Sequence, residues 1–172
     1  ARVVASAQPD GHTLFFTSGS AFAFVNQLVP NLELKLQDFA PVAAVASNPA
    51  VIVVSGNFPA RSLAELAGYA NPAAINFCST GSGGLNHLQL EMFRSVVKAR
   101  TGKGYDVTHV PYNGLAPALT GIRDGSVQAC MLPYTALVKN LNGRDLRVLA
   151  VQSKARLPWL PDVPTTGQQG YP

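Results

Sequence analysis

Apolar and polar positions alternate along the chain with two periods, one typical of strands and one typical of helices. Apolar runs bounded by turn residues predict strands; they are Thr13–Thr17, Val42–Ala46, Ala50–Val54, Ile75–Cys78, Tyr105–Val110, Val127–Leu132 and Leu146–Val151. Apolar residues at helical spacing predict helices between the later strands; they are Ser62–Ala70, a long helix after Gly84, Ala116–Arg123 and Thr135–Leu141. This alternation of strand and helix predicts an α/β fold, a parallel sheet with helices on its faces.

The segment Ile75–His87 is the most informative of these strand–turn–helix units. It has the sequence INFCSTGSGGLNH, so an apolar run meets small and hydroxyl-bearing residues, Ser79–Gly84, which we call the glycine turn. Its glycines allow a sharp turn and the close approach of a ligand, and the first amides of the next helix lack partners within that helix. The pattern predicts a site for an anion, either a carboxylate or a phosphate. The alternative is a tight connection that holds no ligand.

Two further polar turns follow predicted strands. Ser18–Ser20 follows the first strand, and Tyr112–Gly114, which we call the tyrosine turn, follows the strand at Tyr105–Val110. Ligands of open parallel sheets lie beyond the carboxyl ends of the strands. The three turns are therefore predicted to lie at ligand-binding ends of strands, although the tyrosine turn could also be a plain connection.

The composition indicates a folded chain without a nucleic-acid surface. Of the 172 residues, 47% are hydrophobic and only 13% are charged, so the chain can bury a substantial core. The formal net charge of +4 comes from basic residues scattered through the sequence, with no Lys/Arg block, which argues against nucleic-acid binding. A mildly basic chain suits an anionic small molecule.

The cysteines and histidines do not form a metal motif, and no cofactor is predicted. Cys78 and Cys130 each lie in an apolar run; buried free thiols are the favoured interpretation, and a disulfide remains open if the two strands are neighbours. The histidines lack metal-ligand spacing. His87, which follows the glycine turn, could line a site, whereas His12 and His109 are interpreted as structural.

Catalytic motifs are incomplete. Thr80–Gly84 departs at one position from the G-x-S-x-G nucleophile elbow, which leaves a serine ester hydrolase using Ser82 as an alternative function. The triad partners do not fit, because Asp106 and His109 fall on opposite faces of one predicted strand. The glycine turn also lacks the spacing of nucleotide-binding loops. Donor-rich turns without a nucleophile–base pair indicate a protein that holds an anion and is not an enzyme.

Several motifs occur in an order that resembles one family. They are PDGHTL at Pro9–Leu14, DFAPV at Asp38–Val42, GSGG at Gly81–Gly84 with His87, VPYNGLAPA at Val110–Ala118, DGSV at Asp124–Val127, and LAV at Leu149–Val151 with Arg156 and PDVPT at Pro161–Thr165. Together they cover almost the whole chain. They resemble the substrate-binding receptors of tripartite tricarboxylate transporters, the Bordetella uptake gene (Bug) family.

The resemblance implies a periplasmic receptor with two lobes and the type II periplasmic-binding-protein fold. Such a receptor closes around a small carboxylate, a di- or tricarboxylate or an amino-acid-like acid, and presents it to a membrane permease. The resemblance implies no direct membrane insertion and no nucleic-acid partner. Family members hold the carboxylate through backbone amides, loop hydroxyls and water. The ligand contacts implied here are Ser18, Ser20, Ser79, Thr80, Gly81, Ser82, Gly83, Asn86, His87, Tyr112, Asn113 and Gly114.

The resemblance also implies how the chain divides between the lobes. Residues 1–50 would be part of lobe 1, 51–57 a hinge crossover, 58–146 a complete lobe 2, and 147–172 the return crossover with a further part of lobe 1. The family's first ligand loop, its closing helix and a signal peptide have no counterpart here, so a fragment truncated at both ends is expected. Asn113 replaces a usual Lys and Gln128 a common Asp, which leaves the identity of the carboxylate open.

Overall fold

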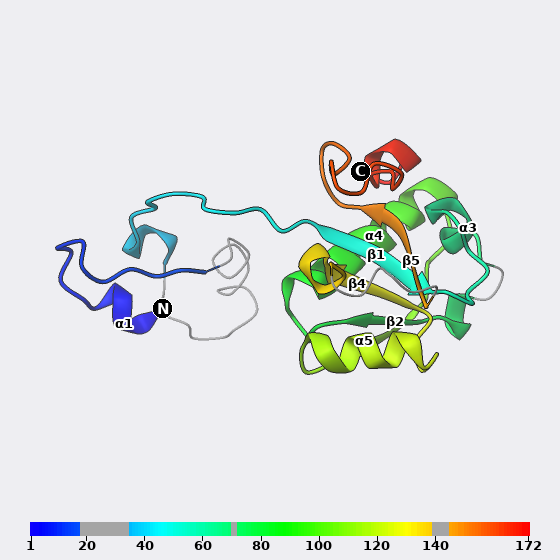
Figure 1. Ribbon diagram of the computed structural model, residues 1–172, viewed down its shortest axis with the longest axis horizontal. Coiled ribbons are helices and arrows are strands. Elements are labelled where there is room, and N and C mark those ends of the chain that lie inside the picture. Colours follow the sequence, from blue (N-terminus) through cyan, green and yellow to red (C-terminus); the bar gives the residue numbers. More distant parts are fainter. Residues whose placement is uncertain (18–34, 70–71, 139–144) are drawn as a thin grey trace. The chain divides into compact units, whose positions relative to one another are not determined.

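The computed structural model describes residues 1–17, 35–69, 72–138 and 145–172, and the chain divides into two compact units, residues 1–47 and 48–172 (Figure 1). The described part of the first unit contains a short helix, α1 (Arg2–Ala5), and a 3₁₀ helix, η1 (Leu36–Asp38). Ser18 and Ser20 lie outside the described residues.

Two predicted strands of the first unit are not formed. The segments 13–17 and 42–46 pair with no other described segment, and Leu14, Phe16 and Val42 are exposed. An apolar run becomes a strand only where a neighbouring strand takes up its backbone hydrogen bonds. The prediction of strands at these two segments was therefore wrong.

The second unit is built on a five-stranded sheet. Its strands are β1 (Ala50–Ser55), β2 (Asn76–Ser79), β3 (Thr108–Pro111), β4 (Ala129–Pro133) and β5 (Leu146–Val151), in the spatial order β3-β2-β4-β1-β5. Strand β2 runs parallel to β3 and β4, whereas β1 runs antiparallel to its neighbours β4 and β5. The α/β prediction is confirmed, and the reversed β1 makes the sheet mixed.

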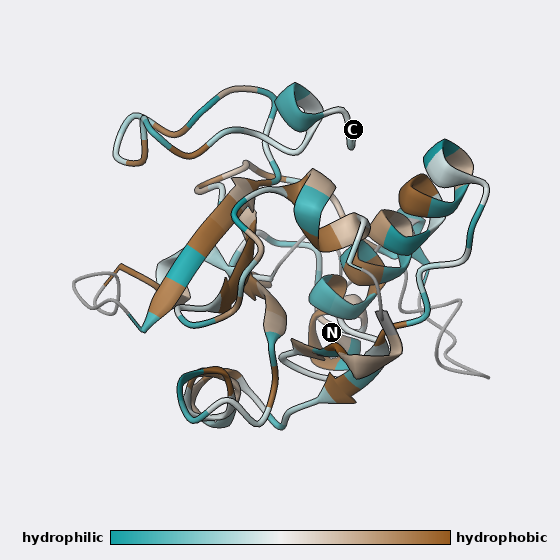
Figure 2. Cartoon of the chain, turned by 90° about the vertical axis from the view of Figure 1, so that its right-hand side faces the viewer, coloured by the Kyte–Doolittle hydropathy of each residue, from teal (hydrophilic) through white to brown (hydrophobic). Residues whose placement is uncertain are grey.

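Helices cover both faces of this sheet (Figure 1). On one face, α3 (Leu63–Ala67) and α4 (Leu85–Thr101) share a buried cluster with Ile52, Phe77 and Met131. On the other face, α5 (Leu115–Arg123) packs with Val53 and Leu132. The central strands are buried on both faces, which explains their nearly continuous apolar sequences, and Figure 2 shows the hydrophobic colouring along the strands.

Short 3₁₀ turns replace or supplement the predicted helices. The helix predicted over 135–141 is represented, within the described residues, by η3 (Tyr134–Ala136), and Pro72–Ala74 forms η2 before β2. A further turn, η4 (Gly167–Gln169), lies in the C-terminal segment. No helix in the described ranges is long and apolar enough to cross a membrane.

The C-terminal segment is tied to the sheet. Thr165 forms a parallel bridge with Val151 at the end of β5. The side-chain carbonyl of Gln169 accepts the Leu63 amide at 2.8 Å, and its side-chain NH₂ donates to the Leu149 carbonyl at 2.8 Å. One side chain thus joins the start of α3 to β5.

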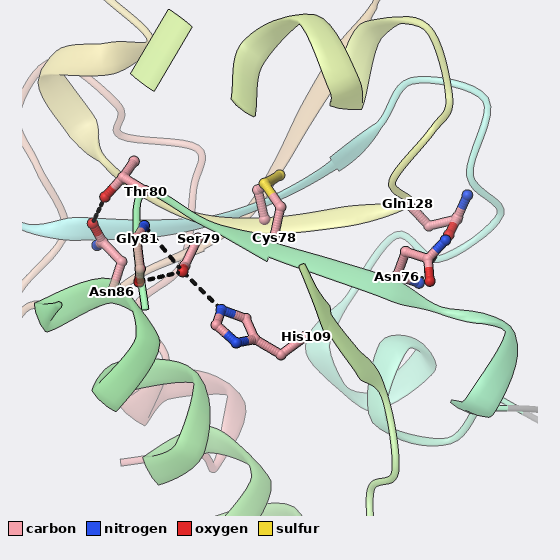
Figure 3. Close-up of a disulfide and its surroundings, with 9 residues drawn as sticks. Asn76, Cys78, Ser79, Thr80, Gly81, Asn86, His109 and Gln128 are labelled. Atoms are coloured by element: carbon pink, nitrogen blue, oxygen red, sulfur yellow. Dashed lines mark hydrogen bonds between the residues drawn. A yellow bond between two sulfur atoms is a disulfide. The ribbon is translucent and has the colours of Figure 1, made fainter. Parts of the chain in front are cut away.

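A disulfide links β2 to β4 (Figure 3). Cys78 and Cys130 stand opposite each other in the parallel pair, with their Cα atoms 4.3 Å apart. The favoured interpretation of buried free thiols was wrong. The outcome depends on β4 lying next to β2, a long-range pairing that the apolar pattern of each strand does not encode.

Candidate functional site

The glycine turn and the tyrosine turn lie side by side at the end of the sheet where β2 and β3 have their carboxyl ends. They follow the carboxyl ends of the parallel neighbours β2 and β3, whose last residues, Ser79 and Pro111, are paired. The Tyr112 amide donates to the Ser79 carbonyl at 3.0 Å, which continues the ladder beyond the strands. The predicted convergence of these two turns at a strand end therefore occurs in the structure.

The glycine turn leads into α4 in a way that leaves two amides at the start of the helix open. Gly81 and Gly83 have φ angles of 153° and 72°, which glycine adopts without a steric penalty. Gly84 is the N-cap of the 17-residue helix α4 and provides no capping side chain. Within the described part of the chain, the amides of Leu85 and Asn86 have no hydrogen-bond acceptor. These donors, at the positive end of the helix dipole, can receive an anion.

Hydroxyl and amide side chains stiffen the two ends of the glycine turn (Figure 3). The Ser79 hydroxyl, which is fully buried, donates to the Gly81 carbonyl at 3.0 Å. The Thr80 hydroxyl donates to the Asn86 side-chain oxygen at 3.0 Å, and the Asn86 NH₂ donates to Gln89 at 3.1 Å. These polar groups already have partners within the protein, whereas Ser82 is exposed at the tip of the turn.

Two imidazole rings lie beneath the glycine turn. His109 Nε2 is 2.8 Å from the Ser79 hydroxyl oxygen, and the His109 ring stacks on that of His87 with centroids 4.0 Å apart. His87 Nδ1 accepts the Gly83 amide at 2.9 Å. Burial lowers the pKa of His109 below its ordinary value, and the neighbouring His87 lowers it further.

The sequence analysis assigned His109 a purely structural part, and the structure places it in this cluster. His109 is paired with Phe77 across the β2–β3 ladder, two residues before β3 ends. The alternation of a strand then directs it to the same face as Pro111. The strand register is the signal that identifies it, and that register becomes visible only once β2 and β3 are known to be neighbours.

The tyrosine turn directs its side chain away from the glycine turn. The Tyr112 ring packs on α5, so that a Cβ atom added to Gly121 would stand 2.7 Å from Tyr112 Cζ. Asn113 is exposed, and Gly114, with φ of 104°, is the N-cap of α5. Of the predicted contacts in this turn, the structure brings the Tyr112 backbone, but not its ring, toward Ser79.

Asn48 and Thr135, which the sequence analysis did not single out, form a polar pair at the same end of the sheet. The Asn48 side-chain NH₂ donates to the Thr135 hydroxyl at 3.0 Å, and the backbone amide of Thr135 donates to the Asn48 side-chain oxygen at 3.3 Å. The Tyr134 amide donates to the Pro49 carbonyl at 2.9 Å. This contact fixes the chain before β1 against the turn after β4.

Gln128 lies at the opposite end of the sheet, where β2 and β4 begin. Its side-chain oxygen accepts the Asn76 amide at 2.9 Å, at the start of β2, and its NH₂ donates to the Gly125 carbonyl at 3.0 Å (Figure 3). The Asp-to-Gln difference from the family pattern is therefore remote from the glycine turn. Its expected influence on ligand identity has no support in this geometry.

The arrangement of the serine and histidine side chains around the glycine turn fits binding better than hydrolysis. Among the described residues, Ser82 bonds to neither imidazole, and the serine that does meet a histidine, Ser79, is buried and donates to the Gly81 carbonyl. A nucleophile must be reachable and paired with its base. The described residues also contain no group of three or more His, Cys, Asp or Glu side chains placed to hold a metal ion.

Comparison with known proteins gives a consistent family match. The chain matches the family described as tripartite tricarboxylate transporter family receptor over residues 1–172. It is 33% identical to protein BugT of Bordetella pertussis, over 98% of this chain and 51% of BugT. The chain spans about half the length of the curated relatives it matches.

Solved structures agree with this match. MatC from Rhodopseudomonas palustris with bound malate aligns with a TM-score of 0.76 and 30% identity, over 99% of this chain and 57% of MatC. The R. palustris protein Rpa4515 with adipate aligns with a TM-score of 0.67 and 32% identity, over 78% of this chain and 44% of that protein. Both alignments support a periplasmic-binding-protein-like fold that is present in part.

Proposed function

Because the chain belongs to the receptor family of tripartite tricarboxylate transporters, we propose that it is part of an extracytoplasmic solute receptor that binds a small carboxylate and delivers it to a transporter of that type. The observation that carries the proposal is the set of open amides at the start of α4, beyond the carboxyl end of β2. A carboxylate accepts hydrogen bonds from such amides and is stabilised by the helix dipole.

The proposed ligand contacts are those of the glycine turn and its surroundings. Ser79, Thr80, Gly81, Gly83, Asn86 and His87 shape or line the turn, and exposed Ser82 adds a free hydroxyl. From the tyrosine turn we propose Asn113 and the backbone of Tyr112 and Gly114 as contacts. The proposed contacts Ser18 and Ser20 rest on the family resemblance alone.

The carboxylate class is proposed from two similar proteins. MatC was solved with malate and Rpa4515 with adipate, which are both small dicarboxylates. The open amides of α4 account for one carboxylate group.

Closure between lobes is the proposed mechanism. The proposed crossover at residues 51–57 begins in β1 and the one that starts at 147 begins in β5, and these two strands are hydrogen-bonded neighbours. Paired crossover strands can bend together as a hinge while the sheet on one side stays intact. Closure over the glycine turn would exclude water and strengthen each hydrogen bond to the ligand.

A periplasmic location is also proposed. The Cys78–Cys130 disulfide is typical of an oxidising compartment, which the bacterial periplasm provides. The similar structures include one described as a periplasmic transporter, with a TM-score of 0.80 and 30% identity.

Calorimetric titration of the full-length protein with malate, adipate, succinate and aspartate tests the proposal. At least one acid is expected to bind, and Gly83→Ala is expected to weaken that binding by about tenfold, because the residue has φ of 72° and alanine strains the turn there. Gly84→Ala is the matched control, since Gly84 has φ of −75° and a Cβ there meets only the Gly81 carbonyl oxygen, at 3.8 Å.

Two results would contradict the receptor assignment. If none of the four acids gives a heat of binding or raises the unfolding temperature, the proposal that the protein binds a small carboxylate is wrong. Turnover of p-nitrophenyl acetate by the parent that disappears in Ser82→Ala would favour the hydrolase instead.

A further inference from the structure

The glycine turn is joined to α4 by a histidine side chain. Gly84, the N-cap of α4, offers no side chain to the first amides of that helix. The Gly83 amide instead donates to His87 Nδ1, at 2.9 Å, in the first turn of α4. Because a nitrogen accepts only when it carries no proton, this bond requires His87 unprotonated at Nδ1.

His109 supports His87 from the neighbouring strand. The two rings are nearly parallel, with an interplanar angle of 9°, and His109 is itself held by the buried Ser79 at 2.8 Å. The Ser79 hydroxyl donates its proton to the Gly81 carbonyl, so His109 Nε2 is left to donate to Ser79 Oγ. A chain of contacts thus runs from one end of the glycine turn, at Ser79, through both rings to Gly83.

We propose that His87 and His109 are positioning residues: with His87 unprotonated at Nδ1, the stacked pair holds the glycine turn in the shape that presents the open α4 amides to a carboxylate. Protonation of His87 at Nδ1 releases the turn, because two donors then face each other at Gly83. The part of this proposal that concerns carboxylate affinity rests on the proposed function, whereas the part that concerns the turn does not.

The charged groups around His87 set the consequences of protonation. Its Nε2 is 3.8 Å from a Glu91 carboxylate oxygen, and that same oxygen accepts from Arg94 at 2.9 Å. Glu91 is therefore already paired and partly exposed, which limits its attraction for a new charge. From β3 the facing group is His109, and because the two rings are stacked, two imidazolium ions at this place would repel each other.

The first test needs no ligand. Nitrogen NMR of the full-length protein with ¹⁵N-labelled histidine reports which ring nitrogen carries the proton. At pH 8 His87 is expected in the Nε2–H form, and acidification to pH 5.5 is expected to shift the Gly83 amide signal together with that ring. An Nδ1–H form of His87 at pH 8, or a Gly83 signal that ignores the titration of His87, would overturn the proposal.

The second test compares two substitutions of one residue. His87→Asn places a carbonyl oxygen near the position of Nδ1 but cannot titrate, whereas His87→Leu removes the acceptor. At pH 8 His87→Leu is expected to bind malate more weakly than His87→Asn by roughly threefold or more, the scale of one net hydrogen bond.

The pH profile separates positioning from simple packing. In acid the parent is expected to lose more malate affinity than His87→Asn does, since only the parent can be protonated at position 87. The variant experiences the same titration of malate and so corrects for it. Equal profiles, or a parent that gains affinity relative to the variant in acid, would overturn the proposal.

Failure here is distinguishable from failure of the proposed function. If no acid binds, the receptor assignment fails while the NMR test still decides whether His87 holds the turn. If malate binds and the NMR and pH results are negative, the receptor assignment stands without this positioning device.

Discussion

The two turns at the carboxyl ends of β2 and β3 occupy equivalent places and are built in different ways. The glycine turn is held by polar contacts from β2, β3 and α4, through Ser79, His109 and His87. The tyrosine turn is held by an aromatic ring that packs on Gly121 in α5. The first turn leaves helix amides open, whereas the second uses its largest side chain to fix the next helix to the core.

This difference shows why a position at a strand end does not by itself make a binding site. Both turns contain glycine with positive φ, at Gly83 and Gly114, and both precede a helix. They differ in where their side chains go, which depends on the partners across the sheet. Breaking each set of partners separately tests the comparison.

The largest expected effect comes from the disulfide beside the glycine turn. Replacing both cysteines, in Cys78→Ala/Cys130→Ala, is expected to lower the free energy of unfolding by about 4 kcal/mol, the loop-entropy value for a sequence separation of 52 residues. Urea unfolding measures the change. Dithiothreitol should destabilise the parent and leave the double variant unchanged; equal sensitivity of the two proteins would contradict the prediction.

The next effect falls on the tyrosine turn. Gly121→Ala is expected to destabilise the fold by about 1–3 kcal/mol, because the added Cβ overlaps the rigid Tyr112 ring. Combining it with Tyr112→Ala should cost less than the sum of the two single changes, since the overlap is gone. Additive effects in thermal unfolding would show that the ring does not pack there.

The same substitution sharpens the functional contrast. Gly121→Ala should leave the affinity for a bound acid from the calorimetric panel within about twofold of the parent, because the ring lies on α5 and away from the open α4 amides. A large loss of affinity would show that the tyrosine side chain belongs to the binding site.

The smallest effect is the pH dependence contributed by His109. Its pKa is lowered in the folded chain, first by burial and then by His87, so the unfolded chain binds the proton more readily. At a pH well above the ordinary imidazole pKa of about 6.5, both the folded and the unfolded chain hold a neutral ring, and His109 costs no stability. As the pH drops through that pKa, the unfolded chain takes up the proton first and the stability of the fold decreases. Solvent screening of this part-exposed ring keeps the loss small.

Urea midpoints at pH 8 and pH 5.5 measure this term. His109→Gln keeps an amide near the position of Nε2 and removes the titration, so its midpoint should fall less than that of the parent. His12→Gln, in the other compact unit, is the control and should follow the parent. A variant midpoint that falls as far as the parent's would contradict the prediction.

The sequence predicted those features that depend on neighbours along the chain. The apolar run before Ser79 and the glycines after it gave the strand, the turn and the start of α4 in the right places. The same local reasoning predicted a helix over Ala116–Arg123, and the structure has α5 at Leu115–Arg123 with Asp124 as its C-cap. Periodicity and turn chemistry act over a few residues and can therefore be recognised in an isolated segment.

Features that depend on strand order were not accessible in this way. The reversed direction of β1, the disulfide and the stacking of His87 on His109 all require knowing which strands are adjacent. The direction of the Tyr112 ring likewise depends on the gap that Gly121 leaves in α5. Each of these features depends on tertiary packing, and no local pattern in the sequence specifies that packing.

The Cys78–Cys130 bond has a consequence for the order in which the chain assembles. It encloses α4, β3 and α5, so the two sulfur atoms can meet in the native arrangement only after all three elements and β4 have been synthesised. Native oxidation of this pair therefore follows the synthesis of β4. A chain that stops before Cys130 keeps Cys78 as an unpaired thiol, so the oxidation state of Cys78 marks whether β2 and β4 have come together.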